Sequence, residues 1–165
     1  MSKTTRIRTE PEPTDRERVR AMTAATGMFH APEIEVAVEL IDDRLAKGAA
    51  SDYLFLFAEL DSATLGYACY GRDTMTESSW ELYWIAVDPR AQGSGIGRTL
   101  LALVENDVRE RGATQLFVET AGRPIYAPTR AFYRATGYTL AAELPDYYAP
   151  GDSKCIFVKR LDAAR

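Results

Sequence analysis

Three glycines, Gly93, Gly95 and Gly97, alternate with other residues between a strand-like segment at residues 80–87 and an apolar helical pattern that runs to Gly112. This sequence predicts a strand, a glycine-rich bend and a helix. The first N–H groups of a helix have no partner within the helix, so such a bend suits an anion, pyrophosphate above all. A strand-to-helix turn with a purely structural role stays open as the alternative.

The glycine spacing excludes two common nucleotide sites. A dinucleotide-binding fingerprint requires G-x-G-x-x-G, and a P-loop requires G-x-x-x-x-G-K followed by Ser or Thr. Residues 93–99 read Gly-Ser-Gly-Ile-Gly-Arg-Thr and match neither pattern. The anion that the bend would bind therefore belongs to another kind of ligand.

The remaining patterns predict alternating strands and helices, with no repeat and no linker long enough to separate two domains. Strands are expected at residues 5–9, 53–60, 65–70, 80–87, 115–120, 138–144 and 154–160, and helices at residues 14–25, 32–47, 100–111 and 129–135. This order predicts an α/β (α+β) fold, a mixed sheet of about seven strands with helices on its faces. The 165 residues fit one domain, 1–165.

Three local features carry more specific expectations. Thr14 followed by Glu17 predicts a capping box at the start of the first helix. Residues 61–64 predict the turn of a hairpin between two aromatic-rich strands. Residues 144–152 contain two prolines and a Gly-Asp pair and are expected to form a loop between the last two strands.

Composition limits the function classes. The net charge of −4 opposes nonspecific nucleic-acid binding, and the two cysteines and one histidine are too few for a zinc site or a disulfide framework. Cys69 and Cys155 are therefore expected to be reduced structural thiols, and His30 a surface side chain. No apolar stretch approaches the length of a membrane span, and the first residues lack a secretory leader, so a cytoplasmic protein is expected.

Two motifs together resemble the GNAT acyltransferase superfamily. Val87-Asp88-Pro89 followed by residues 92–97 resembles its acetyl-CoA signature, Q/R-x-x-G-x-G/A after a strand that ends in Val-x-Pro. Residues 131–138, which contain Phe132-Tyr133 and Gly137-Tyr138, are similar to its F-Y-x-x-x-G-F/Y element. The expected order of strands and helices agrees over essentially the whole chain. The resemblance implies the GNAT fold, in which the middle strands splay apart.

The resemblance also implies acetyl-CoA as cosubstrate and no metal. Backbone groups of the strand before the loop would pair with pantetheine, and those of the loop would hold the pyrophosphate. The implied positions are Ile85, Ala86, Val87, Gln92, Gly93, Ser94, Gly95, Ile96, Gly97, Arg98 and Thr99. Tyr126 stands where many members have an Asn that contacts the cofactor, so a contact of Tyr126 with pantetheine is left open.

Three residues are candidates for the chemistry. Tyr133 matches the family tyrosine that serves the leaving thiolate, first as a hydrogen-bond donor and second as a general acid. Glu81 stands where several protein-modifying members carry a general-base glutamate, and Glu119 at the end of the neighbouring strand is the second candidate. For each glutamate a structural role, or a chain of waters leading to it, is the alternative.

The predicted function is N-acetyl transfer from acetyl-CoA to a primary amine, on a small molecule or a peptide, by direct attack. A non-catalytic acyl-CoA-binding or protein-interaction module on the same fold is the alternative, and transfer of a longer acyl chain is a third reading. No nucleic acid or membrane is expected as a partner. A homodimer is allowed by the resemblance, with the aromatic run at residues 53–57 as either interface or core.

Overall fold

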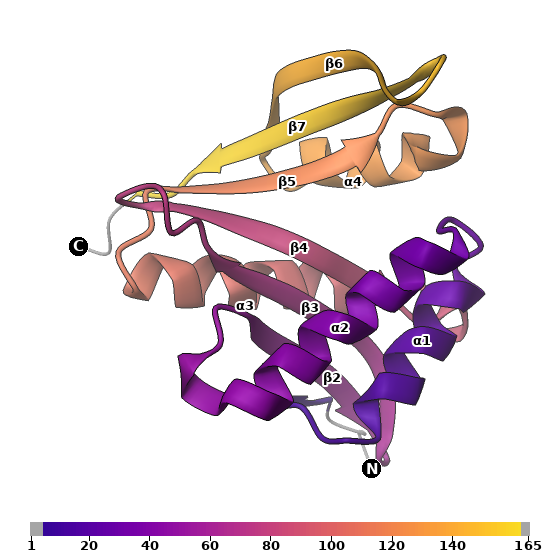
Figure 1. Cartoon of the computed structure of the whole chain (residues 1–165), viewed down its shortest axis with the longest axis vertical. Coiled ribbons are helices and arrows are strands. Elements are labelled where there is room, and N and C mark those ends of the chain that lie inside the picture. The colour runs from indigo at the N-terminus through magenta and orange to yellow at the C-terminus, as the bar shows by residue number, and fades with distance from the viewer. Residues whose placement is uncertain (1–4, 163–165) are drawn as a thin grey trace. The chain divides into compact units, whose positions relative to one another are not determined.

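The computed structural model describes residues 5–162 and contains seven strands, four α-helices and three short 3₁₀ helices (Figure 1). The α-helices are α1 (Asp15–Ala25), α2 (Ala31–Lys47), α3 (Ile96–Glu110) and α4 (Ala127–Ala135). The strands are β1 (Arg6–Arg8), β2 (Leu54–Leu60), β3 (Ala63–Arg72), β4 (Ser79–Val87), β5 (Gln115–Ala121), β6 (Thr139–Ala149) and β7 (Asp152–Arg160). They form one sheet in the order β1-β2-β3-β4-β5-β7-β6. The predicted fold class is confirmed.

Contacts divide the chain into two compact units. Unit 1 takes in the described residues up to Gly71 together with Trp84–Val104, and unit 2 takes in Arg72–Tyr83 together with the residues from Glu105 onward. Strand β4 and helix α3 each contribute residues to both units. The expectation that residues 1–165 act as one domain stays a prediction.

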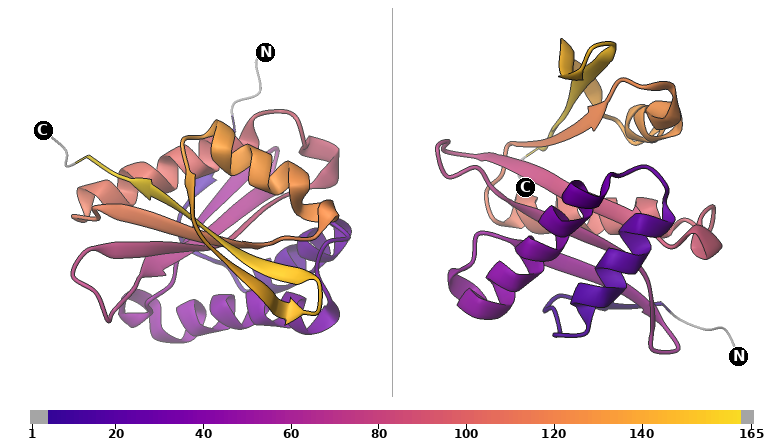
Figure 2. Two further views of the ribbon diagram at one scale, coloured as in Figure 1. Left: turned by 90° about the horizontal axis from the view of Figure 1, so that it is seen from above. Right: turned by 45° about the vertical axis from the view of Figure 1, so that its right-hand side comes forward.

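Unit 1 is built on the β2–β3 hairpin, which turns at Asp61 and Ser62, both with positive φ. Helices α1 and α2 cover one face of the hairpin, and the start of α3 covers the other (Figures 1 and 2). Phe57 lies opposite Tyr67 in the strand register, and both are fully buried on the face covered by α1. The hydroxyl groups of Tyr67 and Thr23 of α1 are 3.3 Å apart, which ties helix to sheet.

The aromatic run at residues 53–57 belongs to this core. Phe55 and Phe57 are buried, and their rings stack with centroids 5.8 Å apart. Burial of a phenylalanine side chain contributes roughly 1.5–3 kcal/mol, so these two rings are a main source of stability in unit 1. Of the two alternatives for this run, Phe55 and Phe57 thus take the core, and they are not available as the interface of the homodimer that the resemblance allows.

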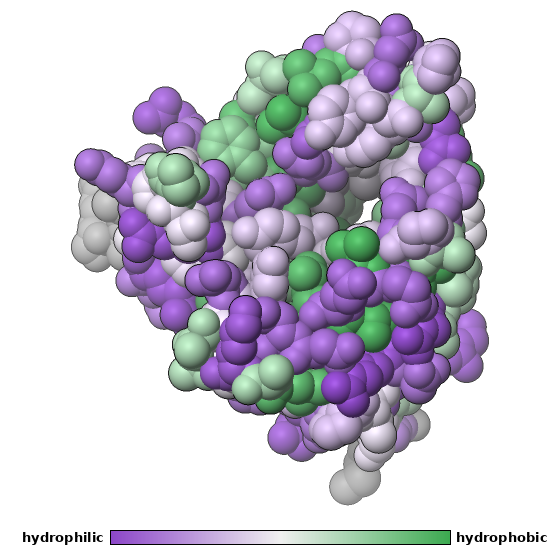
Figure 3. Space-filling view, in the orientation of Figure 1, coloured by the Kyte–Doolittle hydropathy of each residue, from purple (hydrophilic) through white to green (hydrophobic). Residues whose placement is uncertain are grey.

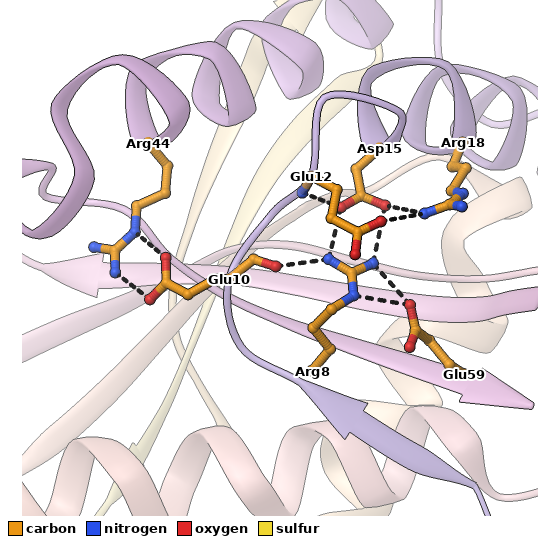
Figure 4. Close-up of polar contacts among 7 residues, drawn as sticks. All are labelled: Arg8, Glu10, Glu12, Asp15, Arg18, Arg44 and Glu59. Atoms are coloured by element: carbon orange, nitrogen blue, oxygen red, sulfur yellow. Dashed lines mark hydrogen bonds and ion pairs between the residues drawn. The ribbon is translucent and has the colours of Figure 1, made fainter. Parts of the chain in front are cut away.

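A buried carboxylate joins α1 to β1 in unit 1 (Figure 4). Asp15 is 0 % exposed, and its two oxygens accept hydrogen bonds from Arg8 at 2.8 and 3.0 Å. They also accept from Arg18 at 3.0 Å and from the backbone N–H of Glu12 at 2.7 Å. Arg8 in turn donates to Glu59 of β2 at 2.8 Å. The network links β1, β2 and α1 through one side chain.

The predicted capping box at Thr14 and Glu17 is wrong. Thr14 is the N-cap of α1 but has helical backbone angles, and its side chain makes no capping hydrogen bond. Glu17 forms an ion pair with Arg20 instead. Asp15 accepts hydrogen bonds from the N–H of Glu12 and from Arg8 of β1, so a buried carboxylate holds the start of the helix.

The outer surfaces of α1 and α2 are polar. Hydrophilic side chains gather over these two helices in Figure 3, among smaller apolar patches. Ion pairs connect the helices here, between Arg20 and Glu35 at 2.8 Å and between Arg16 and Asp42. Because these pairs are largely exposed, each contributes little to stability.

Unit 2 carries the second half of the sheet. Residues Ser79–Leu82 of β4 pair in parallel with Gln115–Val118 of β5, and β5, β7 and β6 pair antiparallel. Helix α4 packs on one face of these strands through Tyr133, whose ring contacts Phe157 of β7 at a centroid distance of 6.0 Å. Successive residues alternate between the faces, so the positions next to the buried ones point away from α4.

The last hairpin differs from the prediction. Residues 144–152 were expected to form a loop, but β6 continues to Ala149 and only a short turn precedes β7. The register shifts between Leu144 and Ala149, around Pro145 and Asp146, and Asp146 has a φ of 54°. Since β6 is an edge strand, it tolerates a proline that a central strand would reject.

Candidate functional site

The glycine bend predicted to bind an anion lies in unit 1 between β4 and α3. Gly93 and Gly95 have φ of 78° and 88°, values that residues with a Cβ rarely adopt. Ser94 between them donates its backbone N–H to the carbonyl of Ala91. Most of the bend is exposed: the exposed positions are Gln92, Gly93, Ser94, Gly95, Arg98 and Thr99.

The start of α3 offers backbone donors beside this bend. The N–H of Thr99 bonds to the carbonyl of Gly95 at 2.9 Å, which is the first hydrogen bond of the helix. The N–H groups of Ile96, Gly97 and Arg98 precede that bond, and the positive end of the helix dipole lies at the same place. This arrangement suits a phosphate or another anion.

Arg90 beside the bend already has a partner. Its guanidinium donates to Asp88 at 2.7 and 3.0 Å, and its backbone N–H donates to the same carboxylate at 2.9 Å. These hydrogen bonds from Arg90 lower the pKa of Asp88 to about 2. The guanidinium of Arg90 is therefore held by Asp88 and is not directed at an anion in the bend.

The carboxyl end of β4 extends beyond its pairing with β5. Among the described residues that pairing ends at Leu82, whereas β4 continues through Ile85, Ala86 and Val87. On the side of β4 that faces β3, Asp88 donates its N–H to the carbonyl of Leu65 at 2.8 Å. The three residues implied to pair with pantetheine thus have no partner on β5.

Glu81 of β4 lies in unit 2 and has an unusual proton affinity. Burial, and next the negative charge of Glu119, raise its pKa from 4.5 to about 7. Asp73 adds to this rise, and the positive charge of Lys154 opposes it. A carboxylate with a pKa near 7 is matched to proton transfer at neutral pH.

Glu119 of β5 has a different environment. Its Oε2 forms an ion pair with Nζ of Lys154 of β7 at 2.6 Å, and Lys154 lies 4.5 Å over the ring of Tyr147. Leu116 and Val118 are buried, so Glu119 points to the opposite face, as its alternation predicts. Lys154 could not be identified from sequence patterns, because its pairing with Glu119 depends on the register between β5 and β7.

Tyr133 of α4 is buried among aromatic rings. Its ring contacts Phe132, Tyr138 and Phe157 at centroid distances of 5.4, 5.6 and 6.0 Å. Burial raises the pKa of its hydroxyl group above the usual value. Tyr133 therefore stays protonated at neutral pH, which makes it a hydrogen-bond donor.

Tyr133 and Glu81 lie on opposite faces of the unit 2 sheet. Phe157, which contacts Tyr133, pairs with Val118, and Val118 pairs with Leu82, so these side chains share the face of α4. Glu81 is next to Leu82 along the strand and therefore points to the other face. One face of this sheet thus carries the hydroxyl group of Tyr133, and the other carries the carboxylate of Glu81.

Tyr126, whose contact was left open, is buried at the start of α4. The guanidinium of Arg123 lies 5.5 Å over its ring. Arg123 also forms an ion pair with Asp152 at 3.0 Å. The ring of Tyr126 thus lies against residues of its own unit.

Residues 5–162 contain no cluster of three or more His, Cys, Asp or Glu side chains that could hold a metal ion. Cys69 and Cys155 are buried free thiols, and His30 is an exposed residue at the start of α2. In the same part of the chain, no helix has the length and apolar character needed to cross a membrane.

Comparison with known proteins identifies relatives. The sequence profile of the acetyltransferase (GNAT) family matches residues 18–138. Blasticidin-S acetyltransferase of Streptomyces morookaense is 42% identical over 82 residues, 49% of this chain and 55% of that protein. The chain thus spans between 31% and 57% of the length of three curated relatives that it matches.

Solved structures extend the likeness over nearly the whole chain. A GNAT-family protein from Desulfovibrio desulfuricans is 43% identical with a TM-score of 0.91, covering 96% of this chain and 100% of that one. A Salmonella typhimurium protein solved with acetyl-CoA has a TM-score of 0.74, 98% and 96% coverage, and 18% identity, so it shows the fold alone.

Proposed function

Because this chain belongs to the acetyltransferase (GNAT) family, we propose that it transfers the acetyl group of acetyl-CoA to a primary amine. The observation that carries the proposal is Glu81, a carboxylate with a pKa raised to about 7 by burial and by Glu119. An alkylamine with the pKa of lysine is only about one part in a thousand neutral at pH 7, a deficit of roughly 4 kcal/mol. A base that titrates near pH 7 can accept the proton that such an amine must lose before its nitrogen attacks.

In this proposal acetyl-CoA binds along β4 and the bend that follows it. The N–H groups of residues 93–98 hold the pyrophosphate, and Ile85, Ala86 and Val87 pair with pantetheine. Support comes from the positive φ of Gly93 and Gly95 and from the β4–β5 pairing that ends at Leu82. The Salmonella protein of the same fold holds acetyl-CoA.

Gly95→Ala is expected to raise the Kd of acetyl-CoA about tenfold, measured by calorimetry. Alanine at a positive φ costs about 1–2 kcal/mol, so the variant bend would favour another conformation that binding must reverse. Gly112→Ala is the matched control, because Gly112 also has a positive φ, 89°, but lies at the end of α3. Equal Kd values for the two variants would contradict the assignment.

The transfer step follows from the two side chains. The amine gives a proton to the carboxylate of Glu81, and its nitrogen lone pair attacks the thioester carbonyl carbon. The tetrahedral intermediate collapses as the C–S bond breaks, and the electron pair leaves with sulfur as the CoA thiolate. The nitrogen loses its second proton to that thiolate, which gives the neutral amide and the CoA thiol. A backbone N–H of residues 85–87 stabilises the oxyanion, and the hydroxyl group of Tyr133 donates to the thiolate.

Tyr133→Phe is expected to lower kcat about 10- to 100-fold while the KM for acetyl-CoA changes little. A hydrogen bond to a charged group contributes about 1.5–3 kcal/mol, and this bond exists only once the thiolate forms. Tyr53→Phe, in unit 1, serves as the control for loss of a tyrosine hydroxyl group. A Tyr133→Phe variant with the kcat of the unchanged chain would rule out this role.

The proposed activity is tested by release of the CoA thiol from acetyl-CoA in the presence of blasticidin S, spermidine, tyramine or a peptide with a free N-terminal alanine. Turnover with any of these amines supports the transferase. The alternative, a non-catalytic acyl-CoA-binding module, is favoured if calorimetry detects acetyl-CoA binding and no amine is acetylated. Faster turnover of a longer acyl-CoA would instead favour the third reading.

A further inference from the structure

One face of the unit 2 sheet brings together two carboxylates and a lysine. On β5, Phe117, Glu119 and Ala121 alternate onto the same face. Glu81 of β4 pairs with Phe117, and Lys154 of β7 pairs with Ala121. Glu119 therefore stands between Glu81 and Lys154 on the face that points away from α4.

Lys154 is held in place by two contacts. Its ammonium nitrogen lies 2.6 Å from Oε2 of Glu119 and 4.5 Å above the ring of Tyr147, and its side chain is only 14% exposed. Burial acts to lower the pKa of Lys154, but the hydrogen bond and negative charge of Glu119, together with Tyr147 and Tyr148, raise it above the usual value. The ammonium group thus stays charged and fixed beside Glu119.

Other charged and titratable groups act on the same face. Asp73, which precedes β4, adds negative charge near Glu81, as does Glu119. Arg72 donates to backbone carbonyls of the β3–β4 loop. Tyr148 of β6 has a pKa raised by burial, so it is neutral at pH 7. Glu119 and Asp73 raise the pKa of Glu81, and the positive charge of Lys154 opposes that rise.

We propose that Lys154 is a positioning residue for acetyl transfer: by holding Glu119 in an ion pair, it leaves Glu81 as the group that accepts the proton of the amine. The inference rests on the proposed function. Two neighbouring carboxylates without a compensating cation share a proton, and neither then works as a base at neutral pH. With Lys154 on Glu119, the two carboxylates take separate roles.

The test is a titration of Glu81 by carboxyl ¹³C NMR, with the signal assigned from its loss in Glu81→Gln. Lys154→Met, which keeps the length of the side chain without its charge, is expected to raise the midpoint by roughly half a pH unit or more. Glu119→Gln is expected to lower this midpoint, and the double variant Glu119→Gln/Lys154→Met is expected to have a midpoint close to that of the unchanged chain. Lys47→Met, which breaks the ion pair with Asp43 in unit 1, should leave it in place.

The same variants are compared in the pH profile of kcat/KM with the amine of the panel that is turned over. A half-unit rise in the midpoint lowers kcat/KM of Lys154→Met at pH 6.5 about threefold, and the loss shrinks as pH rises. Recovery at high pH separates this role from damaged folding. The inference would be overturned if Lys154→Met changed neither the titration midpoint of Glu81 nor the low-pH side of the kcat/KM profile. The proposed function would be overturned if Glu81 titrated as expected but the chain acetylated no amine.

Discussion

Glu81→Gln is expected to lower kcat/KM for amine acetylation at pH 7 by about 10²- to 10⁴-fold, the usual contribution of a general base. Glutamine fills the same space but accepts no proton, so attack must wait for an amine that is already neutral. The residual rate should then rise about tenfold per pH unit, up to the pKa of the acceptor amine. A pH series of thiol-release rates measures both effects.

Glu119→Gln is the matched control for this change. Lys154 already holds Glu119, so its loss removes no base, and the lower pKa expected for Glu81 leaves more of that residue charged at pH 7. Activity at pH 7 should stay within a few-fold of the unchanged chain. A large loss with Glu119→Gln, together with little change for Glu81→Gln, would transfer the role of base to Glu119.

Glu81→Gln should also make the folded chain more stable above pH 7. The folded state raises the pKa of Glu81 from 4.5 to about 7, so it binds this proton more tightly than the unfolded chain does. The charged form is therefore disfavoured by folding, and stability falls as pH rises from about 4.5 to 7. Urea unfolding of the variant at pH 8 separates lost catalysis from lost folding.

Asp15→Ala is expected to lower the free energy of unfolding by about 3–5 kcal/mol, because it removes one partner of a buried ion pair. Arg8, with a side chain 11% exposed, would keep Glu59 as its carboxylate partner among residues 5–162. The backbone N–H of Glu12 would lose its acceptor as well. Chemical denaturation measures the loss.

Asp42→Ala provides the comparison for Asp15→Ala. Asp42 also pairs with an arginine across elements of unit 1, but the side chains of Arg16 and Asp42 are 46% and 47% exposed. Exposed pairs contribute about 0.2–1 kcal/mol, so this variant should unfold close to the unchanged chain. Equal losses for the two aspartates would show that burial does not set the energy of the Asp15 network.

The Asp15 network also predicts a pH dependence. Burial acts to raise the pKa of Asp15, but hydrogen bonds from Arg8, Glu12 and Arg18 lower it below the usual value. The unfolded chain therefore takes up this proton first as pH falls, so the stability that Asp15 supplies is present above the ordinary pKa and is lost below it. Asp15→Ala should accordingly weaken the decline in stability in acid.

Features that depend on local pattern were predictable from the sequence. The alternation around Glu119, the helical stripe of α3 and the glycine bend all follow from neighbouring residues, and the structure places each as expected. Features that depend on distant partners were not. The start of α1 depends on Arg8 of β1, and the partner of Glu119 depends on which residue of β7 lies beside it.

The β6 prediction failed for a related reason. Proline and a Gly-Asp pair usually mark a loop, but the sequence does not say which strand will be at the edge of a sheet. Pro145 has no N–H to donate, and at an edge no neighbouring strand needs it. The position of β6 at the edge of the sheet explains why residues 145–149 continue the strand, with a kink at Asp146.

The irregular β6 edge has a consequence for solubility at high concentration. Leu140, Leu144, Tyr147 and Tyr148 are exposed along this strand, and a straight apolar edge of this kind would recruit a strand from another molecule. Pro145 lacks a donor in the middle of that edge, and Asp146 turns the backbone at positive φ. The kink limits the unbroken stretch that an incoming strand could follow, so the same residues that looked like a loop signal protect the chain against edge-to-edge aggregation.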